Sequence, residues 1–153
     1  MGFSVRQANG NDLDELLRLW KERSEVYIKD PRIKLSADTW RGAVLGWLLR
    51  EDVRVLVADR EDQLIGYIIG WVRQNLPGIT PTHYGLVSEL SVDGHCKQGG
   101  VGTALLAALK TWFKCQNLTY IEVRVPHLQA IEQAFWRASG ASDYYDHMWY
   151  RLE

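Results

Sequence analysis

A glycine-rich turn between a predicted strand and a predicted helix constrains this chain more than any other feature. It reads Lys97-Gln98-Gly99-Gly100-Val101-Gly102, after a strand-like run at 86–92 and before a helix-like run at 101–114. Glycine lets the backbone approach a ligand closely and tolerates positive φ. The first N–H groups of a helix have no partners within the helix and carry partial positive charge. The stretch therefore predicts a backbone cradle for an anion, most often a phosphate or pyrophosphate.

The same glycines have a simpler explanation, a tight strand-to-helix connection in which they serve packing alone. Two known phosphate loops do not fit the stretch. The Walker pattern requires a Lys after its last glycine, whereas Thr103 follows Gly102. The dinucleotide fingerprint requires a third glycine where Leu105 stands, and it follows the first strand of its domain. A different α/β nucleotide-binding protein that uses this turn stays an alternative.

Length and composition set the broad class of protein. The 153 residues are the size of one domain, and 46% hydrophobic with 24% charged residues is typical of globular proteins. A net charge of −1 predicts no nucleic-acid partner, and no apolar run reaches the roughly 20 residues that span a bilayer. Cys96 and Cys115 lack metal-ligand spacing. We therefore expect a single domain over 1–153 with reduced thiols, a cytoplasmic location, no membrane contact and no metal.

The order of the predicted elements gives the fold class. Apolar periodicity and turn residues predict strands at 3–8, 53–58, 64–73, 83–92, 119–125 and 143–152, and helices at 13–30, 37–49, 101–114 and 129–139. The order β-α-α-β-β-β-α-β-α-β favours a mixed α/β sheet with helices on both faces. Strand alternation within 83–92 predicts one face with Leu86, Ser88, Leu90 and Val92, and the other with Val87, Glu89 and Ser91.

The glycine turn, its flanks and the element order resemble the GNAT family of N-acetyltransferases. The family signature, Arg/Gln-x-x-Gly-x-Gly/Ala, starts here at Lys97, a departure that keeps the positive charge. The runs at 89–92 and 105–106 match the family's flanks. The resemblance covers the whole chain in element order. It implies a mostly antiparallel sheet whose strands splay at the cofactor site, and an acetyl-CoA-dependent N-acetyltransferase.

The resemblance also implies which residues bind acetyl-CoA. Its pyrophosphate would lie on the turn, which comprises Lys97, Gln98, Gly99, Gly100, Val101, Gly102 and Thr103. Its pantetheine arm would pair with the backbone of Leu90, Ser91 and Val92. His127 stands where many relatives have Asn after a strand, and Trp136 where many have the Tyr that protonates the departing thiolate. We expect both of these residues to contact the cofactor.

Glu89 is the candidate general base. It lies on the strand that faces the cofactor in the family, and the predicted face that it shares with Val87 would bury it and raise its pKa. Its alternative roles are binding of a cationic substrate and a structural ion pair. Because the indole of Trp136 cannot donate a proton, the general acid is Tyr144, Tyr145 or His127, or the thiolate leaves unassisted. Ordinary packing is the alternative role of these three residues.

The function that the resemblance implies is direct transfer of an acetyl group to a primary amine in a ternary complex. We expect a small-molecule amine as the acceptor and a homodimer contact through the aromatic segment 144–150. One alternative is an acyl-CoA-binding sensor or interaction module with little turnover, which Trp136 at the usual Tyr position favours. Another is acetylation of a protein amine.

Overall fold

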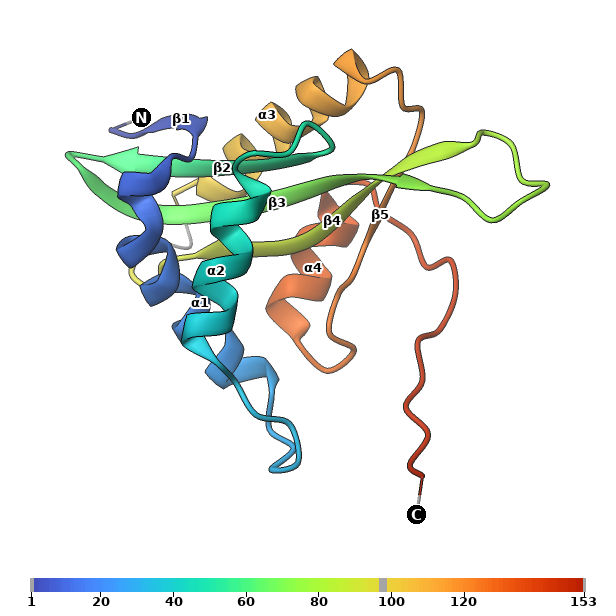
Figure 1. Cartoon of the computed structure of the whole chain (residues 1–153), viewed down its shortest axis with the longest axis horizontal. Coiled ribbons are helices and arrows are strands. Elements are labelled where there is room, and N and C mark those ends of the chain that lie inside the picture. Colours follow the sequence, from blue (N-terminus) through green and yellow to red (C-terminus); the bar gives the residue numbers. More distant parts are fainter. Residues whose placement is uncertain (1, 97–98, 153) are drawn as a thin grey trace.

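The computed structural model describes residues 2–96 and 99–152. The strands are β1 (Ser4–Gln7), β2 (Val53–Arg60), β3 (Gln63–Gln74), β4 (His83–Val92) and β5 (Ile121–Val123), and the helices are α1 (Leu13–Tyr27), α2 (Ala37–Trp47), α3 (Val101–Cys115) and α4 (Ala130–Ala138). The sheet has the order β1-β2-β3-β4-β5, with antiparallel pairing throughout except for the parallel pair β4–β5. The predicted mixed and mostly antiparallel sheet is thus confirmed (Figure 1).

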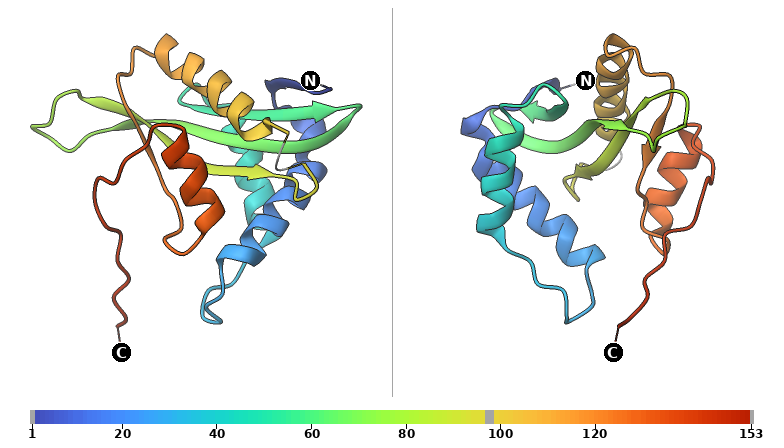
Figure 2. Two further views of the ribbon diagram at one scale, coloured as in Figure 1. Left: turned by 180° about the vertical axis from the view of Figure 1, so that it is seen from behind. Right: turned by 45° about the vertical axis from the view of Figure 1, so that its right-hand side comes forward.

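Helices cover both faces of the sheet, as expected. On one face α1 and α2 pack over a core that includes Leu16, Val44 and Ile69, and on the other α3 packs over a core that includes Ile68 and Leu105. Figure 2 shows α4 on the same side as α3. Neighbouring residues of β3 serve opposite cores, because successive strand side chains point to opposite faces. Burial on both faces explains why β2 and β3 are nearly continuous apolar runs.

Local signals in the sequence set the helix ends. A capping box precedes α1, in which the Asn9 N–H donates to the Asp12 carboxylate (2.8 Å). Ser36 caps α2, because its hydroxyl accepts the Thr39 N–H (3.2 Å). Gly140 ends α4 with φ +104°, in the left-handed region that glycine commonly adopts just after a helix. Among the helices that the structure describes, none combines the length and the apolar character needed to cross a membrane.

A β-bulge in β4 corrects the predicted alternation of this strand. Ile69 pairs with Glu89 while the next residue, Gly70, pairs with Val87, so Ser88 is the extra residue. An extra residue inverts the alternation beyond it, so the two predicted faces are wrong. Leu86, Ser88, Glu89 and Ser91 lie on the α1–α2 side, whereas Val87, Leu90 and Val92 lie on the α3 side.

The last predicted strand, 143–152, does not form in the described part of the chain. Residues 141–152 contain neither helix nor strand and run away from the sheet (Figure 1). The segment is rich in aromatic residues, which favour strands, but a strand also needs a partner with which to exchange hydrogen bonds. The neighbouring strand β5 has only three residues and pairs with β4. Arg151 instead approaches Asp30, in the loop after α1, to within 3.9 Å.

Candidate active site

Strands β4 and β5 separate halfway along β4. Their parallel pairing ends where Val87 faces Val123, and the Arg124 N–H makes a last bond to the Val87 carbonyl (3.5 Å). Thus β5 is shorter than the predicted strand at 119–125, while β4 continues to Val92. Figure 1 shows the two strands diverging from this point. The splayed strands implied by the resemblance are confirmed.

The backbone of β4 beyond the bulge alternates between β3 and this gap. The Asp93 N–H donates to the Ile65 carbonyl (2.8 Å) just past the strand end. In an antiparallel ladder, residues that exchange hydrogen bonds alternate with residues that do not. Ser91 therefore exchanges bonds with β3, and the N–H and C=O groups of Leu90 and Val92 are directed at the gap. An extended ligand that carries amide groups can pair with these two residues as a strand would.

The glycine turn leads into N–H groups at the start of α3 that have no acceptor within the helix. Gly100 holds the N-cap position with φ +76°, where a residue with a Cβ is strained. The first bond of the helix runs from the Ala104 N–H to the Gly100 carbonyl (3.0 Å). The N–H groups of residues 101–103 come before it and lack an acceptor within the helix, which is the predicted anion-binding arrangement. Lys97 and Gln98, which the prediction also included, lie outside the described residues.

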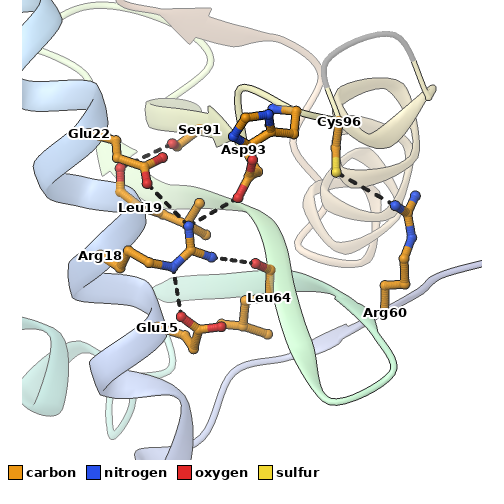
Figure 3. Close-up of polar contacts among 10 residues, drawn as sticks. Glu15, Arg18, Leu19, Glu22, Arg60, Leu64, Ser91, Asp93 and Cys96 are labelled. Atoms are coloured by element: carbon orange, nitrogen blue, oxygen red, sulfur yellow. Dashed lines mark hydrogen bonds and ion pairs between the residues drawn. The ribbon is translucent and has the colours of Figure 1, made fainter.

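An ion-pair network anchors the start of the turn (Figure 3). Arg18 of α1 donates to the Asp93 carboxylate (3.0 Å) and also to neighbouring carboxylates and a β3 carbonyl. Asp93 is buried, and its pKa is lowered by the bond from the His95 N–H and by Arg18. The Cys96 N–H donates to the Asp93 carbonyl (2.8 Å), and the Gly99 N–H donates to the Cys96 carbonyl (3.1 Å). The turn thus starts from a point fixed to α1.

Glu89 points from the bulge toward α1 and α2. Burial raises the pKa of its carboxyl, and the positive charge of Arg23 opposes this shift. The raised pKa was expected, but its cause is the surroundings on this face and not Val87. Within the described residues, Trp40 Nε1 and Tyr67 Oη are buried without a hydrogen-bond partner. A carboxyl with a raised pKa is suited to take a proton from a bound nucleophile near neutral pH.

A second cluster, which the sequence did not indicate, crosses the gap. Arg23 of α1 donates from Nε to the Leu90 carbonyl (3.2 Å), and its Nη2 lies 3.7 Å from Oε1 of Glu132 on α4. The guanidinium lies over the ring of Tyr27, 4.6 Å from its centroid. Burial and Glu132 raise the pKa of Tyr27 to about 12. The members come from α1, β4 and α4, so no local sequence pattern could have found them.

The two tyrosines named as general acids lie in the C-terminal segment. Tyr144 is 83% exposed and Tyr145 is 67% exposed. Burial raises the pKa of Tyr84, and Glu122 and Tyr145 raise it further, which places Tyr145 near the start of β4. Glu89 lies five residues beyond Tyr84 on β4, about 16 Å from it at the usual rise per strand residue. Their catalytic role stays a prediction.

His127 and Trp136, the two other residues expected to contact the cofactor, lie in different surroundings. His127 is exposed in the loop between β5 and α4. Trp136 is buried on the α3 side of the sheet, where its ring meets Phe135 edge to face with centroids 5.2 Å apart. Its Nε1 is buried without a hydrogen-bond partner among the described residues. Contact of either residue with a cofactor stays a prediction.

A family model matches most of the chain. The model described as the acetyltransferase (GNAT) family matches residues 13–140, which span every element from α1 to α4. A search of curated proteins finds no match.

Solved structures share the fold over nearly the full chain. Aminoglycoside N-acetyltransferase AAC(6')-Iy in complex with CoA has a TM-score of 0.82 at 18% identity, covering 98% of this chain and 94% of that one. The 6'-N-acetyltransferase AAC(6')-IG from Acinetobacter haemolyticus has a TM-score of 0.80 at 17% identity, covering 98% of both chains. A mutant of the BH1408 protein from Bacillus halodurans has a TM-score of 0.81 at 23% identity, covering 98% and 99%. At these identities the likeness establishes the fold.

Proposed function

We propose that this chain, which belongs to the acetyltransferase (GNAT) family, acetylates a primary amine of a small molecule. Membership makes it an acetyl-CoA-dependent N-acetyltransferase, so the proposal concerns the acceptor and the residues that act on it. The observation that carries it is the position of Glu89, one residue before the gap-facing Leu90, at the bulge where β4 leaves β5. The neighbours named aminoglycoside acetyltransferases support a small-molecule acceptor.

Two sets of backbone groups fit acetyl-CoA, the donor of the acetyl thioester. The N–H groups of residues 101–103, which have no acceptor within the helix, suit its pyrophosphate, with Gly99 and Gly100 bringing the backbone close. Lys97 and Gln98 complete this proposed set. The gap-facing groups of Leu90 and Val92 suit the amides of the pantetheine arm. The backbone of Ser91 faces β3, so we assign this residue a supporting role, in which its hydroxyl donates to the Leu19 carbonyl (3.4 Å).

Glu89 acts as the general base in the proposed reaction. An ammonium group is not nucleophilic, so a proton must leave it first, and the Glu89 carboxylate accepts that proton. The new amide C–N bond then forms as the thioester C–S bond breaks, and CoA departs as the thiolate. The attacking nitrogen loses its second proton in this step, and that proton balances the charge of the thiolate either directly or through solvent. The N–H of Leu90 or Val92 donates to the thioester oxygen as negative charge develops on it. Tyr144, Tyr145 and His127 stay candidates for protonating the thiolate, which a thiol pKa of about 8.5 also allows to leave unassisted.

Calorimetric titration with acetyl-CoA, with ATP as the control ligand, tests the cofactor site. We expect micromolar binding of acetyl-CoA, about −8 kcal/mol, and no comparable binding of ATP. A free-thiol assay with aminoglycosides, polyamines, amino-acid derivatives and a lysine peptide then tests the acceptor. Thiol release with the small amines supports the proposal, and release with the peptide alone would assign a protein amine. Binding of acetyl-CoA without release for any amine would instead indicate an acyl-CoA-binding module.

We also propose a homodimer contact through the C-terminal segment. Its large apolar side chains lie exposed in the single chain, from 67% for Tyr145 to 91% for Leu152. So many exposed apolar residues in succession are typical of an interaction surface. Sedimentation velocity at increasing concentration should show a dimer that is lost when the chain is truncated after Ser142. A monomer at every concentration would reject the contact.

A further inference from the structure

Within the cluster that crosses the gap, Arg23 is hydrogen-bonded to a backbone carbonyl that the proposed cofactor pairing also uses. The Leu90 carbonyl faces the gap, and the Arg23 Nε already donates to it (3.2 Å). We propose that Arg23 and Glu132 form an ion-pair latch across the gap, and that this latch competes with the pantetheine arm of acetyl-CoA for the Leu90 carbonyl. The inference rests on the proposed binding of acetyl-CoA between β4 and β5. It makes this pair a determinant of cofactor affinity.

The latch joins the two sides of the gap. Arg23 comes from α1, which packs on the β3–β4 face, and Glu132 comes from α4 on the opposite side (Figure 2). Their side chains are 15% and 10% exposed, so the pair lies well inside the surface. A ligand that pairs with both Leu90 and Val92 has to run past the Leu90 carbonyl. A guanidinium bonded to that carbonyl stands in the path of such a ligand.

The latch is incompletely bonded, which makes it able to open. The separation of 3.7 Å between Nη2 and Oε1 is longer than a hydrogen bond. The second carboxylate oxygen of Glu132 is buried without a hydrogen-bond partner among the described residues. A buried ion pair whose hydrogen bonds are incomplete contributes little stability, because desolvation offsets the attraction. A ligand amide that bonds to Leu90 in better geometry can therefore displace Arg23.

If the latch competes with the cofactor, removal of this buried ion pair should tighten ligand binding instead of weakening it. Glu132→Ala removes the anchor of Arg23 and the carboxylate from the gap. We expect calorimetry to show CoA binding about tenfold tighter than in the wild type, equivalent to about 1.4 kcal/mol. Adenosine 3′-phosphate 5′-diphosphate, which keeps the pyrophosphate of CoA but lacks pantetheine, should bind both proteins equally. Arg137→Ala, an exposed position on the same helix, is the control and should change neither affinity.

The outcomes separate the latch from the proposed function. A folded Glu132→Ala variant that binds CoA with unchanged affinity overturns the latch alone, and weaker binding would instead assign Glu132 to holding the cofactor. If neither protein binds CoA or the pantetheine-free fragment, both the latch and the proposed function fail. Thermal melting establishes that the variant is folded. Glu132→Gln, which keeps the side-chain volume, carries the same expected sign and replaces Glu132→Ala if that variant does not fold.

Discussion

The two sides of the splayed strand β4 carry function in different ways. Along the gap and at the start of α3 the candidate groups are backbone atoms, the amides of Leu90 and Val92 and the N–H groups of residues 101–103. On the α1–α2 side they are side chains, with Glu89 and Arg23 set among aromatic rings. A backbone site depends on local chain geometry, whereas a side-chain site depends on how distant elements pack. Substitutions at the glycine turn should therefore change cofactor binding, and substitution of Glu89 should change the chemical step. Arg23 bears on both, because its guanidinium opposes the raised pKa of Glu89 and also bonds to the gap-facing Leu90 carbonyl.

Glu89→Gln should have the largest effect. The amide keeps the size of the carboxyl but cannot accept the proton of an ammonium, so we expect turnover to fall by about 100-fold or more. The dissociation constant of acetyl-CoA, measured by calorimetry, should stay within about twofold of the wild-type value. Glu61→Gln, at an exposed position in the β2–β3 turn, should leave both quantities unchanged. Unchanged turnover of the Glu89→Gln variant would remove this residue from the mechanism.

Gly100→Ala should weaken cofactor binding while leaving the base intact. Among the described residues, an alanine Cβ there would meet no atom within 4 Å, so the substitution acts through the left-handed backbone conformation, at roughly 1–2 kcal/mol. Gly78→Ala is a matched control, since Gly78 has φ +87° and equally open surroundings outside the site. Both variants should lose similar stability in thermal melts. We expect only Gly100→Ala to weaken acetyl-CoA binding, by about tenfold. Equal losses of acetyl-CoA affinity in the two variants would argue against a cofactor role for the turn.

The pH profile tests the side-chain site through Arg23→Gln. Glu89 is active as the carboxylate, and burial raises its pKa, so kcat/KM should fall with acidity at a pH above the ordinary glutamate value of about 4.3. Arg23 opposes that shift by favouring the carboxylate. Its removal should raise the pKa of Glu89 further and move the acid limb of the profile to higher pH. A limb that stays in place or moves to lower pH would show that Glu89 is not the titrating base.

Tyr144→Phe and Tyr145→Phe should have the smallest effects. Both side chains are largely exposed, and Tyr145 lies near the end of β4 remote from Glu89. We expect each variant to retain turnover within about twofold, as is usual for exposed positions. A loss of tenfold or more in turnover at saturating substrate would instead identify that tyrosine as the general acid.

The same contrast explains how much the sequence revealed. Strand periodicity, the caps at Asn9 and Ser36 and the glycine turn are local features, so the element order and the cradle could be predicted from them. The bulge at Ser88 could not, because it appears only in the register against β3. The predicted strand at 143–152 is wrong for a similar reason, since its aromatic-rich residues favour a strand but find no partner in the sheet.

The Arg23–Glu132 contact shows more clearly what cannot be predicted from the sequence. Both residues belong to amphipathic helices, where a charged side chain ordinarily lies in solvent. Their pairing depends on how α1 and α4 are placed on either side of the gap beside β4, which no periodicity in either helix indicates. Glu89 was identified as a candidate, but the residues that face it, Trp40 and Tyr67, come from α2 and β3.

Amide hydrogen exchange of the wild-type protein, with and without acetyl-CoA, tests the central claim most directly. If the glycine turn and the gap together bind the cofactor, exchange should slow at Leu90, Val92 and residues 101–103. It should stay unchanged in the hairpin of β2 and β3 around the Glu61–Asp62 turn. Bound acetyl-CoA that leaves exchange at the turn and the gap unchanged, or slows it elsewhere in the chain, would contradict the account.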